Sequence, residues 1–172
     1  MMNIESYIRV TPDFPKQGII FRDFTPLLAN GPAFKALTDL FAERYADKQI
    51  DVVVGIEARG FVLASALAYA LGAGTVLVRK EGKLPHETHA QEYELEYGSS
   101  VLEINRDAFE DGQRILVIDD VLATGGTVNA ALKLIREHFS VSVEELVFLM
   151  ELVDLKGREK LPSLPIYSAF SY

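Results

Sequence analysis

The segment Arg114–Asn129, RILVIDDVLATGGTVN, combines residue types that could bind an anion. Its apolar run Ile115–Ile118 is too short for a buried helix and predicts an interior strand of a parallel sheet. Asp119 and Asp120 follow where that strand should end, and the loop Ala123–Thr127 leads into apolar positions at helical spacing. This order of strand, acid pair, loop and helix is typical of an anion site at a helix N-terminus.

The loop has the chemistry that a phosphate requires. A helix start leaves backbone N–H groups unpaired, Gly125 and Gly126 let an anion approach the backbone, and Thr124 and Thr127 add hydroxyl donors. It is not a Walker loop, because no Lys-Ser or Lys-Thr follows the glycines, and not a Rossmann fingerprint, because the acids precede the loop. The remaining alternative is a helix cap with a permissive turn. We therefore predict a phosphate site whose ligand has hydroxyl groups or a metal beside its phosphate.

Other patterns predict the elements that must hold this segment. We expect, in chain order, a short helix at 3–10, extended chain at 18–26, a helix after the Asn30 cap with Phe34, Leu37, Phe41 and Tyr45 facing the core, a strand at 50–56, a helix at 61–71, strands at 75–78 and 99–105, a helix at 127–139, a strand at 146–152, one helical turn at 156–161 and extended chain at 166–172. Alternating strands and helices predict an α/β fold with a parallel sheet and right-handed crossovers.

Charged residues follow three of the expected strands. Ligands of such sheets bind beyond the carboxyl ends of the strands. The charged residues there form three clusters, Glu57 with Arg59, Arg79 with Lys80, and Asp119 with Asp120. We predict that these clusters converge on one site. The polar segment Arg79–Tyr97 is expected to be a long mobile loop that could contain a hairpin arm, because loops of this length usually act as lids or binding loops.

Composition narrows the class of protein. The 172 residues suit one domain, or one domain with a small appendage, and 49% hydrophobic residues can form a substantial core. A net charge of −8 disfavours a nucleic-acid partner, so an anionic ligand needs locally concentrated donors. The absence of cysteine excludes disulfides and cysteine-ligated metals. No signal peptide or membrane-length apolar run is visible, so we expect a cytoplasmic protein with no membrane partner.

Six segments together resemble a known family. They are FRDFTPLL (Phe21–Leu28), GIEARGF (Gly55–Phe61), VRKEGKLP (Val78–Pro85), YELEYG (Tyr93–Gly98), VIDDVLATGGT (Val117–Thr127) and LKGREKL (Leu155–Leu161). The segment VIDDVLATGGT is similar to the phosphoribosyl pyrophosphate signature of type I phosphoribosyltransferases. All six segments, in this order, resemble more narrowly the branch of that family that uses adenine. The resemblance spans nearly the whole chain.

The resemblance implies a fold and a reaction. The fold would be the type I phosphoribosyltransferase fold, a single domain over 1–172 with a parallel central sheet flanked by helices. Residues 1–30 and 150–172 would contribute a small base-binding hood, and 79–97 a mobile lid. The reaction would transfer phosphoribosyl from phosphoribosyl pyrophosphate (PRPP) to adenine with Mg²⁺, giving AMP and pyrophosphate with inversion at the anomeric carbon. The partners would be these small molecules and a second copy of the chain in a homodimer.

The resemblance also assigns roles to individual residues. The 5′-phosphate would lie on Ala123, Thr124, Gly125, Gly126 and Thr127. The ribose hydroxyls would contact Asp119 and Asp120, directly or through the hydrated metal, with no direct metal ligand assigned beyond these two. The pyrophosphate would be bound by Arg59, Arg79, Lys80 and Lys83. The catalytic residues would be Arg59, Glu96, which handles a proton of the purine, and Tyr97, which helps to close the lid. Adenine would be bound by Ile20, Arg22, Glu151 and Leu152.

Several of these residues have simpler explanations. Asp119 and Asp120 could cap a strand end, and Arg59 could form a salt bridge with Glu57. Lys83 and Glu96 could be solvated loop charges, and Ile20 and Leu152 could be core residues. The run HETHAQE between Pro85 and Tyr93 departs from the family pattern. Its His86 and His89 are expected to be solvated lid residues, since a metal site would need a third ligand.

One position favours adenine as the base. Family members that use 6-oxopurines have an Asp where this chain has Ala123, and that Asp handles a purine proton. Its absence here, with Glu96 available, implies adenine. Two alternatives stay open, a phosphoribosyltransferase for another base and a non-catalytic regulator that binds PRPP. Retention of the whole lid segment favours the enzyme.

Overall fold

The computed structural model describes residues 2–94 and 98–172 and contains two compact units, Met1–Ala46 and Asp47–Tyr172. In the first unit, the 3-10 helix η1 (Ile4–Tyr7) precedes an antiparallel hairpin of β1 (Arg9–Pro12) and β2 (Ile20–Asp23). The predicted helix at 3–10 is therefore wrong after Tyr7. The reason is that Arg9 and its successors pair with β2, an interaction that local sequence does not encode.

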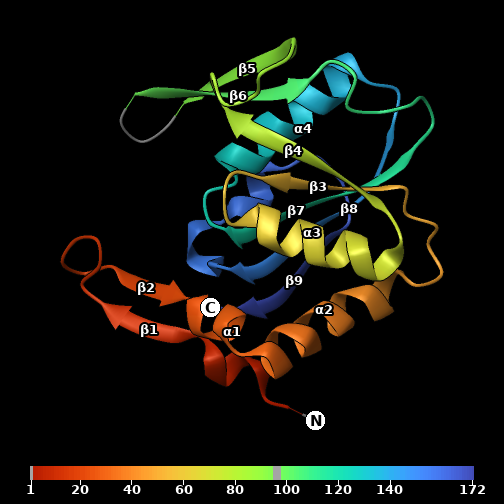
Figure 1. Ribbon diagram of the computed structural model, residues 1–172. Coiled ribbons are helices and arrows are strands. Elements are labelled where there is room, and N and C mark those ends of the chain that lie inside the picture. Colours follow the sequence, from red (N-terminus) through yellow and green to blue (C-terminus); the bar gives the residue numbers. More distant parts are fainter. Residues whose placement is uncertain (1, 95–97) are drawn as a thin grey trace. The chain divides into compact units, whose positions relative to one another are not determined.

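Two helices complete the first unit (Figure 1). The short helix α1 (Thr25–Ala29) was not predicted, and Pro26 lies in its first turn, where proline is tolerated. The predicted Asn30 cap is confirmed, because Asn30 Oδ1 accepts the Ala33 N–H at 3.0 Å at the start of α2 (Gly31–Tyr45). Of the four core positions predicted in α2, Phe34 is only half-buried and the other three are buried.

The second unit contains a seven-stranded sheet in the order β5-β6-β4-β3-β7-β8-β9. Its strands are β3 (Val52–Ile56), β4 (Gly74–Lys80), β5 (Thr88–Glu94), β6 (Ser99–Asn105), β7 (Arg114–Leu122), β8 (Ser142–Glu151) and β9 (Ile166–Ser171). Strands β4, β3, β7, β8 and β9 are parallel, as predicted, whereas β6 is antiparallel to both β4 and β5. Two 3-10 turns, η2 (Val153–Leu155) and η3 (Gly157–Lys160), connect β8 to β9.

The antiparallel edge changes the expected loop at 79–97. Arg79 and Lys80 end β4, and residues 88–94 form β5, paired along their whole length with β6. The polar composition of β5 suits an edge strand, which exposes one side to solvent. The partner of β5 is β6, which lies outside 79–97, so the described part of this segment does not contain both strands of the hairpin arm that the sequence left as an option. The connection that remains outside the strands before β5 is residues 81–87. The lid itself stays a prediction.

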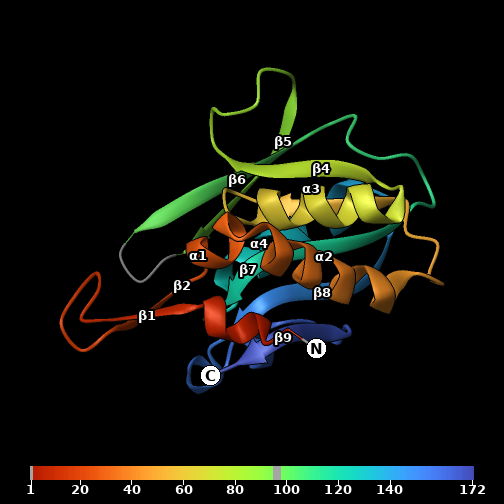
Figure 2. The same cartoon turned by 60° about the horizontal axis from the view of Figure 1, so that its bottom comes forward.

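Two helices cover opposite faces of the sheet (Figure 2). Helix α4 (Gly126–His138) packs on the face to which Val52, Val54 and Ile56 point. Helix α3 (Gly60–Leu71) packs on the other face, where a Cβ on Gly55 would lie 2.9 Å from Ala64 Cβ. Alternate residues of a strand point to opposite faces, so β3 is covered on both sides and reads as a continuous apolar run. No described helix is both long and apolar enough to cross a bilayer.

Strand β7 extends further than predicted. Its pairing with β3 ends at Ile118, whereas its pairing with β8 continues to Leu122, opposite Glu151. Asp119 and Asp120 therefore lie inside the strand, not after it. The cause is the ten-residue length of β8, which supplies backbone partners past the point where β3 turns into α3.

Candidate functional site

The loop between β7 and α4 surrounds a pocket at the N-terminus of the helix. The pocket is lined by Asp119, Val121, Leu122, Ala123, Thr124, Gly125, Gly126, Thr127 and Val128. Gly125 adopts a left-handed φ of +80°, and its carbonyl accepts the first hydrogen bond of the helix, from Asn129 N–H at 3.0 Å. The preceding N–H groups have no partner within the helix and carry the positive end of its dipole. The five loop residues predicted to bind phosphate therefore line one anion-compatible pocket.

The acid pair borders this pocket. Asp119 lines it, and the side chain of Asp120 is only 7% exposed. The Asp120 N–H donates to Asp119 Oδ1 at 2.8 Å. Burial and the adjacent Asp120 charge raise the pKa of Asp119 well above its ordinary value. The two carboxylates are thus held together against their electrostatic preference, which is typical of a site that awaits a cationic or hydroxyl-bearing partner.

Helix α3 begins directly against this pair. A Cβ on Gly60 would lie 3.0 Å from Asp119 Oδ1 and 3.0 Å from Ile118 O, so glycine allows the close approach of the helix start. The residue before it, Arg59, forms an ion pair with Asp120, with 2.8 Å between Nη2 and Oδ2. Arg59 therefore lies between α3 and the acid pair, with its side chain half exposed.

Glu57 joins the same segment to the end of β4. Its Oε2 accepts the Lys80 N–H at 2.8 Å and contacts Arg79 Nε at 3.2 Å. Arg79 also donates from Nη1 to Lys83 O at 3.0 Å and lies 5.8 Å from the centre of the Phe61 ring. The peptide bond between Glu57 and Ala58 is cis. The segment Glu57–Arg59 thus connects the other two charged clusters, and the predicted convergence is seen in the structure.

The predicted adenine contacts lie in different units. Ile20 and Arg22 belong to β2, and Ile20 is 57% exposed, which disagrees with a core role. Leu152 is half-buried, and its N–H donates to Leu122 O at 2.9 Å. Glu151 is buried and forms an ion pair with Arg158. Glu96 and Tyr97 lie outside the described residues.

The histidines of the segment before Glu96 differ from each other. His86 is exposed, as expected. His89 is half-buried, and its ring stacks on His138 at the end of α4, with 3.8 Å between centroids and 3° between planes. The expectation that His89 is a solvated residue is therefore wrong, because β5 packs along α4. Among residues 2–94 and 98–172, no three His, Asp or Glu side chains form a metal-binding cluster.

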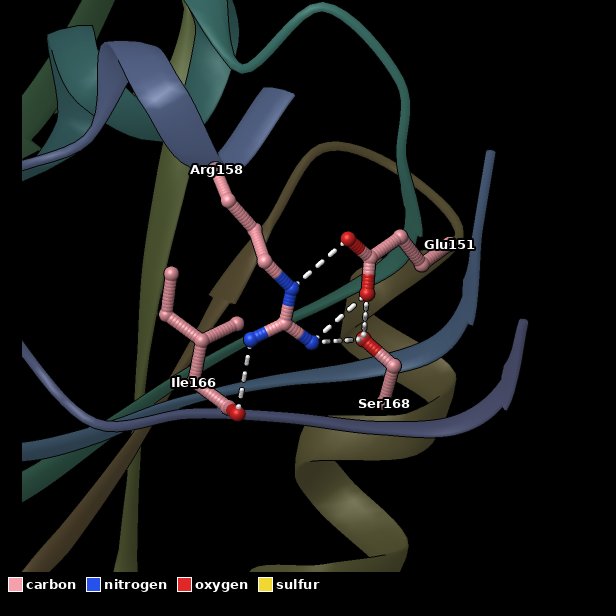
Figure 3. A network of polar contacts seen from close by, with 4 residues as sticks. All are labelled: Glu151, Arg158, Ile166 and Ser168. Carbon is pink, nitrogen blue, oxygen red and sulfur yellow. Dashed lines mark hydrogen bonds and ion pairs between the residues drawn. The ribbon is translucent and has the colours of Figure 1, made fainter. Parts of the chain in front are cut away.

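Sequence reasoning assigned no role to two residues that contact the loop or its neighbours. Gly157 packs directly on Ala123 and Gly125, and Arg158 binds Glu151 (Figure 3). Both residues lie in the LKGREKL segment. The sequence pattern that could have indicated them is a glycine followed by an arginine in a mostly polar turn. Its contact with the loop depends on tertiary structure.

Comparison with known proteins agrees with this site. The family model described as phosphoribosyl transferase domain matches residues 24–164. An adenine phosphoribosyltransferase of Roseiflexus sp. (strain RS-1) is 54% identical over 170 residues, which is 99% of this chain and 98% of that protein. The chain therefore belongs to the phosphoribosyltransferase family, and within it to the adenine phosphoribosyltransferases.

Solved structures give the same result. The adenine phosphoribosyltransferase of Thermoanaerobacter pseudethanolicus has a TM-score of 0.92 and 46% identity, with 98% of each chain covered. The enzyme of Saccharomyces cerevisiae, in a complex with adenine and an imino-altritol bisphosphate, has a TM-score of 0.90 and 41% identity, with 96% of this chain and 95% of that chain covered. The predicted α/β fold with a mostly parallel central sheet is thereby confirmed.

Proposed function

We propose that this protein transfers the 5-phosphoribosyl group from PRPP to adenine, which gives AMP and pyrophosphate. The observation that carries this proposal is the phosphate-compatible loop at α4 beside an acid pair that faces Arg59. A phosphate next to vicinal hydroxyls and a pyrophosphate leaving group would use all of these groups at once. The full-length similarity to adenine phosphoribosyltransferases supports the same reaction.

The loop would act on the 5′-phosphate. Its backbone N–H groups at the start of α4, with the hydroxyls of Thr124 and Thr127, would fix this end of PRPP. Asp119 and Asp120 would then accept hydrogen bonds from the ribose hydroxyls. Such positioning lowers the barrier because the anomeric carbon is held in place for attack by the base.

Mg²⁺ suits the donors present. Mg²⁺ is commonly held by one or two carboxylates together with substrate phosphates and water. Asp119 offers a carboxylate in the lining of the pocket, and the adjacent Asp120 offers a second one beside Arg59. We propose that these two residues hold the hydrated ion against PRPP. When bound, the ion would neutralise the charge that develops on the leaving pyrophosphate.

Arg59, Arg79, Lys80 and Lys83 are the proposed pyrophosphate ligands. Arg59 is half exposed beside Asp120, and Arg79 and Lys80 end β4 next to Glu57. Arginine suits bidentate binding of phosphate, and lysine supplies a mobile point charge. The residues of the proposed lid would exclude water during transfer. Glu96 would take up the purine proton and Tyr97 would close the lid.

Adenine is proposed as the base because Ala123 replaces the acid of the 6-oxopurine enzymes. Ile20, Arg22 and Leu152 stay the predicted base contacts, whereas the carboxylate of Glu151, the fourth predicted contact, is bound by Arg158. A homodimer is also proposed, and support comes from helix α3, on which Val62 and Tyr69 share a face and are 42% and 90% exposed. A cytoplasmic location stays a prediction.

The test is a direct assay. Purified protein is incubated with Mg²⁺, PRPP and each of adenine, hypoxanthine, guanine, xanthine and uracil, and nucleotide formation is followed by chromatography. We expect AMP from adenine and at least about 100-fold less product from the other bases, which corresponds to about 3 kcal/mol of discrimination. Faster nucleotide formation from another base than from adenine would refute the assignment. Binding of PRPP without any turnover would indicate a regulator.

A further inference from the structure

The turn that follows β8 packs on the back of the phosphate loop. A Cβ on Gly157 would overlap Ala123 O and would lie 2.9 Å from Leu122 Cδ1. In the opposite direction, a Cβ on Gly125 would lie 2.7 Å from Gly157 O. The two backbones are thus in contact at a distance that only a pair of glycines permits. The carbonyl of Ala123 and the left-handed Gly125 cannot move toward the turn.

The same turn is tied to the sheet by an arginine. Arg158 donates from Nε to Glu151 Oε1 at 2.7 Å and from Nη2 to Glu151 Oε2 at 2.6 Å. Its Nη1 donates to Ile166 O at 3.2 Å, and Ser168 Oγ donates to Glu151 Oε2 at 3.1 Å (Figure 3). Glu151 ends β8, and Ile166 and Ser168 belong to β9. One side chain therefore attaches η3 to two strands.

The charges of this pair are stable. The bidentate contact with Arg158 lowers the pKa of Glu151, and the contact with Glu151 raises the pKa of Arg158. Glu151 is only 5% exposed, and both of its carboxylate oxygens accept hydrogen bonds from Arg158. A buried carboxylate whose two oxygens both accept hydrogen bonds from one guanidinium has a well-defined position. A residue so held is better suited to support a neighbour than to change partners.

We propose that Gly157, Arg158 and Glu151 are positioning residues for the 5′-phosphate. Gly157 sets the backbone of the phosphate loop from behind, and the Arg158–Glu151 pair sets Gly157 by anchoring η3 to β8 and β9. Glu151 then acts on PRPP through the loop. It does not act on the base, although the family resemblance had implied a contact with the base. This inference rests on the proposed use of the loop as a 5′-phosphate site.

The first variant tests the contact itself. Gly157→Ala would push Ala123 away from its position, so we expect the KM for PRPP to rise at least about tenfold while the KM for adenine changes less than about threefold. The Kd for ribose 5-phosphate, measured by calorimetry, should rise by the same factor as the KM for PRPP. The matched control is Gly31→Ala, because a Cβ there meets nothing within 4 Å and the φ of Gly31 is not positive. That control should leave all three constants unchanged.

Two further variants distinguish support of the phosphate loop from binding of the base. Glu151→Gln keeps the size of the side chain and removes its charge, and Arg158→Lys keeps the charge and removes the fork. We expect both to raise the KM for PRPP and the Kd for ribose 5-phosphate about three- to tenfold, with the KM for adenine unchanged. If Glu151→Gln raised only the KM for adenine, or if Gly157→Ala left ribose 5-phosphate binding intact, the inference would be wrong. If the wild-type protein did not bind ribose 5-phosphate at all, the proposed function itself would fail.

Discussion

The ion pair between Arg59 and Asp120 should contribute measurably to folding. Asp120 is buried, with 7% of its side chain exposed, whereas Arg59 is 51% exposed, and 2.8 Å separates Nη2 from Oδ2. Removal of one partner of a buried ion pair costs about 3–5 kcal/mol, and exposed ion pairs contribute about 0.2–1 kcal/mol. A pair with one buried and one half-exposed member should lie between these limits. We expect a coupling free energy of about 1–2 kcal/mol.

A double-mutant cycle measures this coupling. Arg59→Gln, Asp120→Asn and the double variant would be unfolded in urea at pH 7 and compared with the wild-type protein. Arg59→Gln alone should be strongly destabilising, because it leaves Asp120 beside Asp119 without its cation. The same change in the Asp120→Asn background should cost about 1–2 kcal/mol less. Because Arg59 has further contacts, only the coupling term, and not the single-variant value, reports on this pair.

Two further observations sharpen the result. The coupling should fall only slightly between 0.05 and 0.5 M NaCl, because the buried carboxylate is poorly screened. A coupling below about 0.5 kcal/mol would be ordinary additivity and would refute the reasoning. The exposed pair Lys35–Asp39 in α2 is the matched control, since both side chains are solvated and its coupling should be about 0.3–0.5 kcal/mol.

Two other variants test the charges at the edges of the site. Asp119→Asn should raise the melting temperature of the ligand-free protein at pH 7, because it removes one of two adjacent carboxylates while its Oδ1 can still accept the Asp120 N–H. The same variant should raise the KM for PRPP at least about tenfold. A lower melting temperature would contradict this prediction. Burial and the nearby His138 and Arg106 lower the pKa of His89, and Arg106 is itself paired with Glu87. The folded protein therefore favours neutral His89, so the free energy of unfolding should fall as the pH drops through the folded-state pKa of this residue. The melting temperature should therefore drop less between pH 7 and pH 5 in His89→Phe than in the wild type, with the exposed His86→Gln as control, and equal drops in both would contradict the prediction.

Short-range patterns predicted the centre of the second unit well. The buried strands β3 and β7 and the helices α3 and α4 follow from apolar runs and helical spacing, because each depends on burial of its own residues. The Asn30 cap also depends only on neighbours in the chain. Features that depend on pairing were missed. They include β1, whose partner residues in β2 lie 8 to 14 positions away, and β5, whose polar residues become a strand only beside β6.

The same distinction explains the site. Types and spacing sufficed to predict the loop at 123–127 and the convergence of the charged clusters. They did not predict that Glu57 would contact Arg79 while Arg59 contacts Asp120, because either acid was a possible partner for Arg59. The contact of Gly157 with Ala123 spans 34 positions of sequence and involves only backbone on one side. No side-chain pattern reports such a contact.

Three glycines bring the parts of this site together. Gly60 brings α3 to Asp119, and Gly125 and Gly157 bring the phosphate loop to the turn after β8. At each point a side chain would lie where backbone or a carboxylate now lies, so the separation of the segments is set by the absence of a Cβ. The charged side chains can then converge even where their individual contacts do not have ideal geometry, because the backbones that carry them are fixed. It follows that this site should tolerate exchange of a loop hydroxyl, such as Thr124→Ser, far better than addition of one methyl group at Gly157.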